Sequence, residues 1–264
     1  MPKEKTNYVE IYYNDEGSGE TVLLLHGLSD SADIWQIIKG DLIRDYRVIL
    51  MDLRGHGRSD KPETPYSIRK FSNDVENLLN ALNVEKVYIV GFSLGGVVAQ
   101  QFALNNPEKV ISLILLSTFS YVDRDLEKKF RTLRDKLLHG GCGVFYDEVI
   151  KLVLTPQFLN KYESELDAGK KLCLEMNSAY ALIKIIDALI RFNLKNEIKS
   201  ISQPTLIISG KNDIFTPPHF SRQLHNSIIN SQLKIVDNVG HNLLVPENIP
   251  YLADLILNFL NSIK

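Results

Sequence analysis

The stretch YIVGFSLGGVVAQQFAL, residues 88–104, holds a serine between two glycines, at Gly91, Ser93 and Gly95. The apolar run before the serine is typical of a buried β-strand, and the apolar run after it is typical of a helix. Glycines at both positions permit a tight turn that would lift Ser93 out of the end of a sheet. A G-x-S-x-G pentapeptide also occurs in ordinary glycine-rich turns. The rest of the chain is therefore needed to tell a catalytic serine from a serine in such a turn.

The composition predicts a globular chain with a large core. Its 264 residues are 44% hydrophobic, enough for one domain of alternating strands and helices with an insertion. The 30 basic and 32 acidic side chains give a formal net charge of -2. Because so balanced a charge offers no broad attraction to a polyanion, the composition argues against a nucleic-acid partner and against an anionic membrane surface.

The cysteines and the N-terminal segment exclude further classes of protein. Cys142 and Cys173 lack CxxC spacing and are too few for a disulfide framework or a cysteine-rich zinc site, so we expect inert thiols and no metal. Residues 1–17 contain no apolar signal-peptide core, and the longest apolar run, residues 110–116, is too short to span a bilayer. We therefore expect a soluble, cytoplasmic protein without membrane contact.

The alternation of apolar patterns predicts the fold class. Short β-rich runs alternate with helix-period stretches, which indicates an α/β fold with a mostly parallel central sheet flanked by helices. The expected strands lie at residues 8–13, 22–25, 48–51, 87–90, 111–116, 206–208 and 233–236. Apolar residues at steps of three and four predict helices over residues 68–82 and 249–263, the first capped by Ser67.

The pattern changes between residues 121 and 195, where helix-period segments rich in Lys, Glu and Leu replace the strands. We therefore predict a core made of residues 1–120 and 196–264, with a helical cap of residues 121–195 inserted after the strand at 111–116. The motif HGGCG, residues 139–143, predicts a hinge in this cap. An insertion between two strands belongs above the carboxyl edge of the sheet, where open α/β sheets bind ligands.

A serine hydroxyl is a weak nucleophile, so Ser93 needs a base within hydrogen-bond reach and a third group that orients the base. The helix after the bend brings its first unpaired amides beside Ser93, which makes the Leu94 N–H the expected donor to a developing oxyanion. A second donor should come from the loop after an earlier central strand. The segment LLLHGL, residues 23–28, runs from a strand into such a loop, and its Leu28 N–H is the candidate.

Ordered motifs along the chain resemble those of the α/β-hydrolase family, in particular its capped carboxylesterase and 3-oxoadipate enol-lactonase-like branch. They are HGLSDSADIW (26–35), DLRGHGRSD (52–60), GFSLGG (91–96), LIISGKNDIFTP (206–217) and NVGHN (238–242). The resemblance covers most of the chain outside the cap. It implies the α/β-hydrolase fold and a serine hydrolase that cleaves small carboxylic esters or lactones without a cofactor. The N-terminal segment is short for this family, which leaves the presence of its first antiparallel strand open.

By this resemblance the acid is Asp213 and the base is His241, and Ser93 attacks to form an acyl-enzyme. The residues alone favour the same histidine, because His241 follows a late strand in a glycine-containing loop, unlike the other five histidines. Asp123 and Asp237 are alternatives for the acid. Asp123 is more typical of a helix cap and Asp237 of a solvated turn, so Asp213 is preferred.

Two motifs have structural explanations that outweigh cofactor binding. The segment DLRGHGRSD lacks the Lys-Ser/Thr ending of a phosphate-binding loop, and we expect Asp52 and Arg54 to satisfy the backbone of this turn. The stretch around Ser93 has no G-x-G-x-x-G pattern, which argues against NAD.

Several aromatic side chains are candidates for an acyl or alcohol pocket, since ligand sites of this kind are mostly apolar. They are Trp35, Phe92, Phe119, Tyr121, Phe145 and Tyr146. Each of them is also typical of a packed core. Phe92 and Phe119 are the strongest candidates because they flank strand ends beside the predicted site.

Other activities remain open at this stage. A carbon–carbon bond hydrolase, a perhydrolase or an aminopeptidase would use the same three residues, although Leu94 stands where a prolyl aminopeptidase ordinarily carries tryptophan. Ser93 argues against dehalogenases and epoxide hydrolases, which use an aspartate nucleophile. A receptor that binds ligands without turnover is the alternative outside enzymes. The sequence leaves the physiological substrate open, and it does not distinguish a monomer from a homodimer.

Overall fold

The computed structural model describes residues 3–6 and 9–264. Within these residues eight strands form one sheet, in the order β1-β2-β4-β3-β5-β6-β7-β8. The strands are β1 (Lys3–Thr6), β2 (Val9–Glu16), β3 (Thr21–Leu25), β4 (Arg47–Met51), β5 (Val87–Phe92), β6 (Val110–Leu116), β7 (Thr205–Gly210) and β8 (Ser231–Val236). The pairs β1–β2 and β2–β4 are antiparallel and all the others are parallel. The predicted, mostly parallel α/β fold is confirmed.

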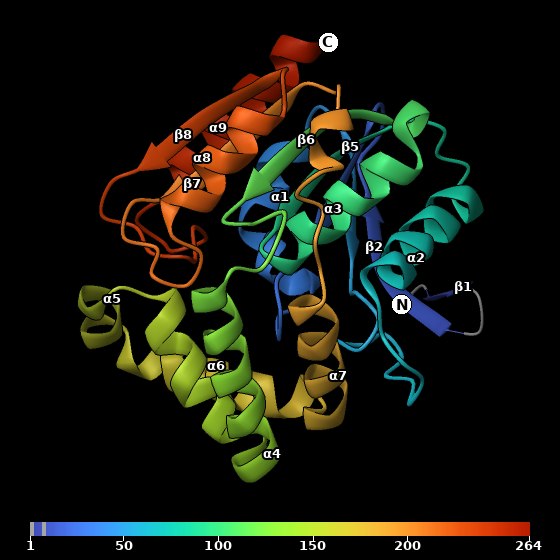
Figure 1. Ribbon diagram of the computed structural model, residues 1–264. Helices are drawn as coiled ribbons and strands as arrows, with labels where there is room; N and C mark the ends of the chain where they lie inside the picture. The colour runs from blue at the N-terminus through green and yellow to red at the C-terminus, as the bar shows by residue number, and fades with distance from the viewer. Residues whose placement is uncertain (1–2, 7–8) are drawn as a thin grey trace.

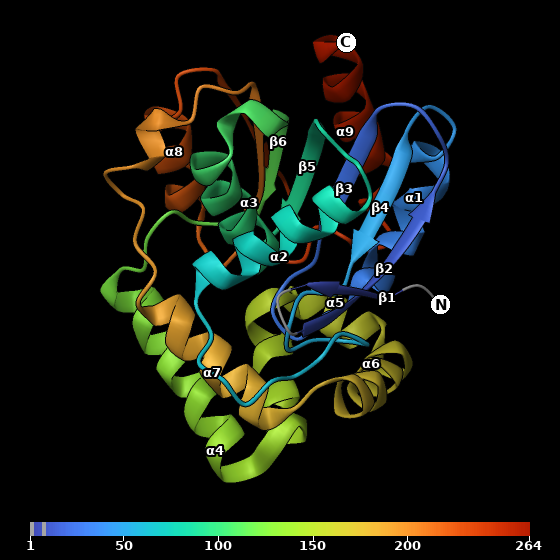
Figure 2. The ribbon, with the colours of Figure 1, turned by 90° about the vertical axis from the view of Figure 1, so that its right-hand side faces the viewer.

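Helices cover both faces of the sheet (Figure 2). One face carries α1 (Gln36–Leu42) and α9 (Ile249–Ile263), and the other carries α2 (Ile68–Ala81), α3 (Leu94–Asn105) and α8 (Pro218–Ser227). Short 3-10 helices lie at Ala32–Trp35, Pro107–Lys109 and Ile198–Ser200. The chain therefore has the three-layer arrangement that a doubly covered parallel sheet requires.

The alternation of side chains along β3 shows how the two cores form. Leu23 and Leu25 pack with the apolar sides of α2 and α3, whereas Val22 and Leu24 pack with those of α1 and α9. Successive side chains of a strand point to opposite faces, so both sets become fully buried. This is why the central strands appear in the sequence as continuous apolar runs.

Four further helices gather beyond the ends of the parallel strands (Figure 1). They are α4 (Arg124–Val153), α5 (Pro156–Lys161), α6 (Glu163–Met176) and α7 (Ala179–Ile190). Asp123 caps α4, because its Oδ1 accepts a hydrogen bond of 2.8 Å from the Leu126 amide. Gly141 interrupts α4 with φ of 66° and ψ of -167°, which kinks the helix within the predicted hinge motif. We refer to α4–α7 as the cap helices.

The N-terminal edge of the sheet extends further than the sequence indicated. The antiparallel strand β1, whose presence the sequence left open, pairs with β2. The strand predicted at residues 8–13 continues to Glu16 as β2, while Tyr8 lies outside the described residues. The polar end was missed because Asp15 and Glu16 suggest a turn. At the sheet edge these carboxylates pair with Arg47 and Lys39, at 2.6 and 2.7 Å, so strand pairing continues through them.

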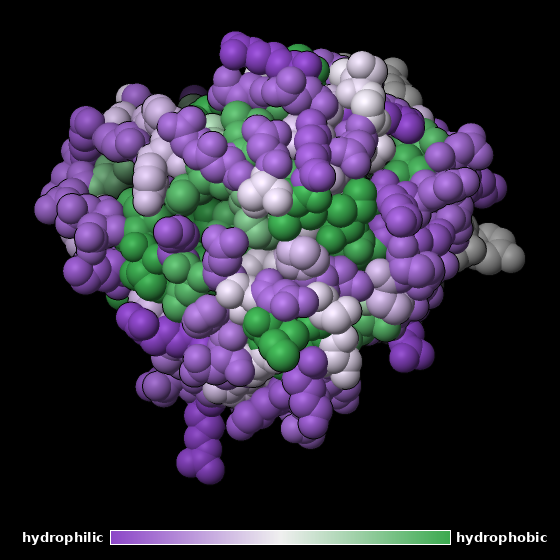
Figure 3. Space-filling model, turned by 90° about the horizontal axis from the view of Figure 1, so that it is seen from above, coloured by the Kyte–Doolittle hydropathy of each residue, from purple (hydrophilic) through white to green (hydrophobic). Residues whose placement is uncertain are grey.

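Hydrophilic side chains surround separate hydrophobic patches on the face that lies away from the cap helices (Figure 3). None of the helices in the described residues combines the length and the apolar character needed to cross a bilayer. The long helix α4, for example, contains many Lys, Arg, Asp and Glu residues.

Candidate active site

Ser93 occupies the bend between β5 and α3. Its φ of 52° and ψ of -111° lie outside the regions that a serine ordinarily adopts, so the surrounding structure must hold it there. The Ser93 amide donates to the Leu116 carbonyl oxygen at 2.8 Å, and the Thr118 hydroxyl donates to the Ser93 carbonyl oxygen at 2.8 Å. Bonds to β6 and the segment after it therefore hold Ser93 at the carboxyl edge of the sheet.

The glycines of the motif permit close packing of backbone on backbone. A Cβ atom at Gly95 would overlap the carbonyl oxygen of Leu25 and lie 2.8 Å from that of His26. A Cβ atom at Gly91 would lie 2.5 Å from the carbonyl oxygen of Gly95. Only glycine allows the start of α3 to approach the end of β3 so closely. This contact brings the Ser93 bend beside the loop that carries Leu28.

The structure brings Ser93, His241 and Asp213 together from three separate loops. His241 Nε2 lies 3.0 Å from Ser93 Oγ, and His241 Nδ1 lies 2.8 Å from Asp213 Oδ2. A carboxylate only accepts hydrogen bonds, so Nδ1 carries the proton toward Asp213, and Nε2 is left as an acceptor for the serine hydroxyl. The side chains of His241 and Asp213 are 2% and 0% exposed, which keeps water from competing for these bonds.

Asp213 is held by an unusually complete set of donors. The amides of Phe215 and Thr216 both donate to its Oδ1 at 2.8 Å, and the Thr216 hydroxyl donates to Oδ2 at 2.9 Å. These hydrogen bonds fix the position of the carboxylate. Sequence reasoning missed Thr216. Its signal was the spacing Asp-x-x-Thr before Pro217, which is typical of a side chain that closes a turn on its own backbone.

The alternative acids lie elsewhere. Asp123 caps α4, and its Oδ2 lies 3.2 Å from Nε2 of His219. Asp237 forms an exposed ion pair of 2.7 Å with Lys211. Within the described part of the chain neither carboxylate contacts His241. Asp213 is therefore the acid that the geometry places on the histidine.

The turn at residues 52–60 supports the loop that follows β3. Asp52 is fully buried and accepts from the amides of Ala32 and Arg58, at 2.6 and 2.7 Å. The expected role of Arg54 in satisfying this turn is wrong, because its guanidinium pairs with the buried carboxylate of Asp74 in α2. An arginine side chain is long enough to reach past its own turn to a neighbouring helix, and a buried carboxylate requires a partner.

His26 and His56, which belong to the motifs at residues 26–35 and 52–60, hold loops in place. His26 Nε2 accepts from the Leu53 amide at 2.9 Å, which joins the ends of β3 and β4. Burial lowers the pKa of His26, and it lowers the pKa of His56 well below the ordinary value for histidine. Both rings therefore stay neutral and hold the loops around the site.

The amides proposed from the sequence as oxyanion donors are free to bind. Leu94 is the first residue of α3, where a helix leaves its amides unpaired. Leu28 lies in the loop after β3, and across the described residues neither amide has a hydrogen-bond acceptor. The close approach at Gly95 brings together the start of α3, which carries the Leu94 amide, and the end of β3, which leads to Leu28.

A cavity of about 430 Å³ lies between the cap helices and this edge of the sheet, with Ser93 and His241 in its wall. Its lining is mostly apolar, and much of it comes from the cap as Val149, Ile150, Val153, Leu154, Leu166 and Met176. The volume and the apolar lining suit a small organic ligand with one reactive polar group.

The structure separates the six aromatic pocket candidates. Phe92 and Tyr146 line the cavity, and so do Phe158 and Phe215, which sequence reasoning did not single out. Phe92 and Phe215 place their ring centroids 5.4 and 5.1 Å from that of His241. The sequence could have found Phe215 by its place directly before Thr216, two residues after Asp213.

Of the other four candidates, three pack in the core and Tyr121 is half-buried against it, and none of the four lines the cavity. Trp35 and Phe145 are fully buried, Phe119 lies among other phenylalanine rings, and the Tyr121 ring lies 5.7 Å from that of Phe220. Consecutive helix residues point about 100° apart, which is why Phe145 faces the core when Tyr146 faces the cavity. A single sequence cannot distinguish these two environments for an aromatic side chain.

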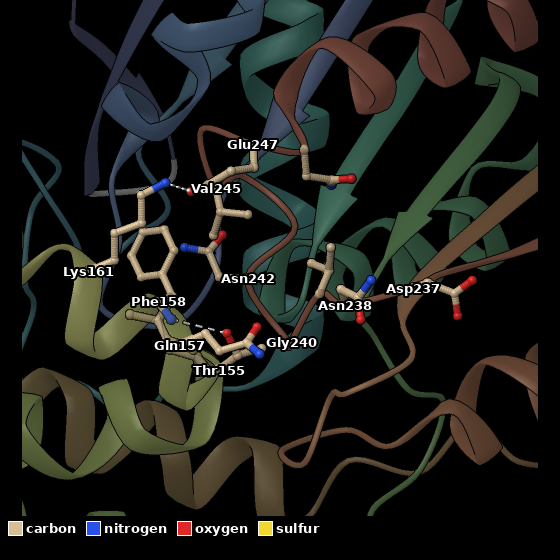
Figure 4. A pocket seen from close by; sticks show the side chains of 14 residues that line it. Thr155, Gln157, Phe158, Lys161, Asp237, Asn238, Gly240, Asn242, Val245 and Glu247 are labelled. Carbon is tan, nitrogen blue, oxygen red and sulfur yellow. Dashed lines mark hydrogen bonds and ion pairs between the residues drawn. The ribbon is translucent and has the colours of Figure 1, made fainter.

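The end of α4 and helix α5 are both tied to the loop that carries His241, and Figure 4 shows the contact with α5. The Asn242 amide donates to the Val153 carbonyl oxygen at 2.9 Å, and Lys161 pairs with Glu247 at 2.7 Å. A shallow pocket lies along this junction, lined by residues of α5 and of the loop. The position of His241 thus depends partly on the cap. Among the described residues no three His, Cys, Asp or Glu side chains gather as a metal site would require.

Comparison with known proteins agrees with this geometry. Residues 20–247 match the family described as alpha/beta hydrolase fold. The AB hydrolase superfamily protein YisY of Bacillus subtilis is 30% identical over 272 residues and covers 97% of each chain. The putative carbamate hydrolase RutD of Serratia proteamaculans is 28% identical over 243 residues, or 91% of each chain.

Among solved structures, the enol-lactonase from Burkholderia xenovorans superposes with a TM-score of 0.91 at 22% identity, covering 98% of this chain and 100% of its own. Est816, described as an N-acyl homoserine lactone degrading enzyme, gives a TM-score of 0.86 at 28% identity over the same shares. The first likeness concerns the fold alone. By the family match over most of its length, together with the close relatives, this chain belongs to the α/β-hydrolase family.

Proposed function

We propose that this protein is a serine hydrolase that cleaves small carboxylic esters or lactones through an acyl-enzyme on Ser93. The observation that carries the proposal is the pair of contacts made by His241, whose Nε2 lies 3.0 Å from Ser93 Oγ while Asp213 holds its Nδ1 at 2.8 Å. This is the arrangement in which a histidine can accept the serine proton as the hydroxyl attacks.

In the first half of the reaction Ser93 Oγ attacks the substrate carbonyl carbon, and its proton passes to His241 Nε2. The Asp213 carboxylate stabilises the imidazolium that forms. The carbonyl oxygen becomes an oxyanion and binds the amides of Leu28 and Leu94. The tetrahedral intermediate then collapses, the carbon–oxygen bond to the leaving alcohol breaks, and that alcohol takes the proton from Nε2.

In the second half water attacks the acyl-enzyme and gives a proton to His241 Nε2. The same two amides bind the second oxyanion. Collapse releases the carboxylic acid, and Ser93 recovers its proton from the imidazolium. For a lactone, the alcohol and the acid remain parts of one product. Every proton in this scheme is carried by His241.

The cavity supports an ester or lactone with a small to medium acyl group. Its walls are mostly apolar, and its volume of about 430 Å³ limits the length of the chain that fits. The lactone-degrading activity named for Est816 is consistent with this substrate class. The aromatic rings of Phe92 and Phe215 flank His241 and shield the reacting atoms from water.

The proposal is tested with p-nitrophenyl esters of rising acyl length and with a series of simple lactones. Wild type should hydrolyse the shorter members, and Ser93→Ala should lower kcat by a factor of up to about 10⁶. Ser262→Ala, on the far helix α9, is the matched control and should keep wild-type turnover. Equal turnover by wild type and Ser93→Ala would discard the proposal, as would the absence of turnover by wild type on every member.

A further inference from the structure

Asp30 places a carboxyl group in the wall of the reaction cavity. It lies two residues after Leu28 in the loop between β3 and the first 3-10 helix, and it lines the same cavity as Ser93 and His241. A Cβ atom at Gly27 would lie 2.9 Å from Asp30 Oδ2 and 3.0 Å from the Phe92 ring. The carboxyl therefore packs against the backbone at Gly27, in the loop that carries Leu28, and lies beside Phe92.

The charged groups around this cavity are all acidic. Asp30, Asp33 and Glu165 line it, and no lysine or arginine appears among the described residues of its wall. The charge of Asp33 is neutralised by Arg58, because Arg58 Nη2 lies 2.8 Å from Asp33 Oδ1. Glu165 is exposed on the first turn of α6. Asp30, which is half-buried, is thus less exposed than Glu165 and has no basic partner among the described residues of this wall.

The groups that face Asp30 do not supply a lasting positive charge. The Tyr146 hydroxyl and the Cys173 thiol lie on α4 and α6, and burial raises the pKa of each to about 12, so both stay neutral. The Gly27 amide and His241 favour the ionised carboxylate. The imidazolium of His241 is a cation only when this residue cannot act as the base. When His241 is in the neutral form that acts as the base, a substrate anion therefore meets no cation among the described residues of the cavity wall.

We propose that Asp30 sets the charge preference of the reaction, so that neutral and cationic esters or lactones are accepted and substrates carrying a carboxylate are rejected. This inference rests on the proposed hydrolase function and specifies its substrate class. The physical reason is the repulsion between like charges in a cavity where surrounding protein weakens solvent screening. Asp30 acts here on substrate selection, and the bond-breaking steps remain with Ser93 and His241.

The preference should depend on pH near neutrality. Enclosure of the Asp30 carboxyl raises its pKa to about 7, with His241 and the Gly27 amide opposing the rise. Below that pH the carboxyl is neutral, and above it the carboxylate is charged. Discrimination against an anionic substrate should therefore be weak in mild acid and should grow as pH rises through about 7.

The test compares two esters of nearly equal size, p-nitrophenyl pentanoate and the mono-p-nitrophenyl ester of glutaric acid, which stays ionised from about pH 6 to about pH 9. The measured quantity is the ratio of kcat/KM for the neutral ester to that for the anionic ester. Both esters use the same serine and histidine, so effects on their shared chemical steps cancel in this ratio. In wild type the ratio should rise with pH to roughly tenfold or more. In Asp30→Asn it should be smaller and independent of pH.

Asp41→Asn, which removes the same charge from the exposed surface of α1, is the control and should keep the wild-type pH profile. A wild-type ratio that stays flat across this pH range, or one that Asp30→Asn leaves unchanged, overturns the inference while hydrolysis of the neutral ester sustains the proposed function. Failure of wild type to hydrolyse either ester is a failure of the proposed function instead. The wild-type profile needs no variant, so a folding defect in Asp30→Asn cannot hide the outcome.

Discussion

The strand-end loops and the cap helices enclose one cavity but hold their side chains in different ways. In the loops, Ser93 is fixed by its amide bond to Leu116 of β6 and by the Thr118 hydroxyl, and Asp213 by two amides and a hydroxyl. The cap contributes apolar side chains to the cavity and reaches the loops through a few polar contacts, such as that of Asn177 with Ser29. Under the proposed function, the strand-end loops carry the chemistry, while the cap helices and Asp30 of the loop after β3 form the walls that select the substrate.

The largest difference in activity between variants of the two regions should come from the loop after β7, which carries Asp213. Asp213→Asn leaves His241 with the wrong tautomer facing Ser93, and kcat should fall by about 10⁴. Asp123→Asn, at the start of the cap helix α4, should stay within about twofold of wild type, because asparagine also caps a helix and only the charge beside His219 is lost. Steady-state kinetics on a short p-nitrophenyl ester measures both, and the reverse order would move the acid to Asp123.

A second contrast concerns backbone packing and is measured as stability. Gly95→Ala forces a methyl group onto the carbonyl oxygens of β3 and should lower the free energy of unfolding by about 3 kcal/mol or more. Gly143→Ala, in the cap helix α4, meets only side chains at 3.7 and 3.8 Å and should leave stability unchanged or raise it by about 0.5 to 1 kcal/mol. Urea unfolding of both variants checks this, and equal losses would show that the two regions pack alike.

A smaller effect is expected at Thr216, which bridges Asp213 and His241. Thr216→Val removes a hydroxyl 2.9 Å from Asp213 Oδ2 and 3.0 Å from His241 Nδ1 while keeping the shape of the side chain. The loss of one hydrogen bond to a charged group should reduce kcat roughly tenfold. Thr216→Ser should restore most of that loss. Unchanged kcat in Thr216→Val would show that the two main-chain amides alone hold the carboxylate.

The smallest effect should come from the polar contact between cap and loop. Asn177→Ala removes the hydrogen bond of 2.9 Å from Asn177 Nδ2 to the Ser29 carbonyl oxygen. Because this contact positions a cavity wall and touches no reacting atom, KM should rise a few fold while kcat stays near the wild-type value. A large loss of kcat with unchanged KM would assign the cap a part in the chemistry.

The sequence predicted the sheet and the bend at Ser93 well for a common physical reason. The parallel strands are buried on both faces, so each appears as a continuous apolar run whose position can be read directly. The bend at Ser93 requires glycine on both sides, which leaves a visible pattern. The histidine and the acid follow strand ends, which a parallel sheet brings to one edge.

The cavity wall could not be predicted in the same way. Trp35 and Phe145 are core residues, although nothing in their sequence surroundings differs from that of Phe92 or Tyr146. The environment of an aromatic side chain in the cap depends on how the helices rotate against the sheet, and that rotation is a tertiary property. Asp30 escaped notice because its place in the cavity wall appears only once the loop and the cap are brought together.

The claim that Ser93 is an activated nucleophile is tested most directly by covalent labelling with a fluorophosphonate, followed by peptide mass analysis. We expect one phosphonyl group per chain, attached to Ser93. In His241→Ala this labelling should disappear, because the Ser93 hydroxyl then lacks its base. Attachment to Ser117 in place of Ser93, or undiminished labelling of Ser93 without His241, would contradict the claim that the bend presents an activated nucleophile.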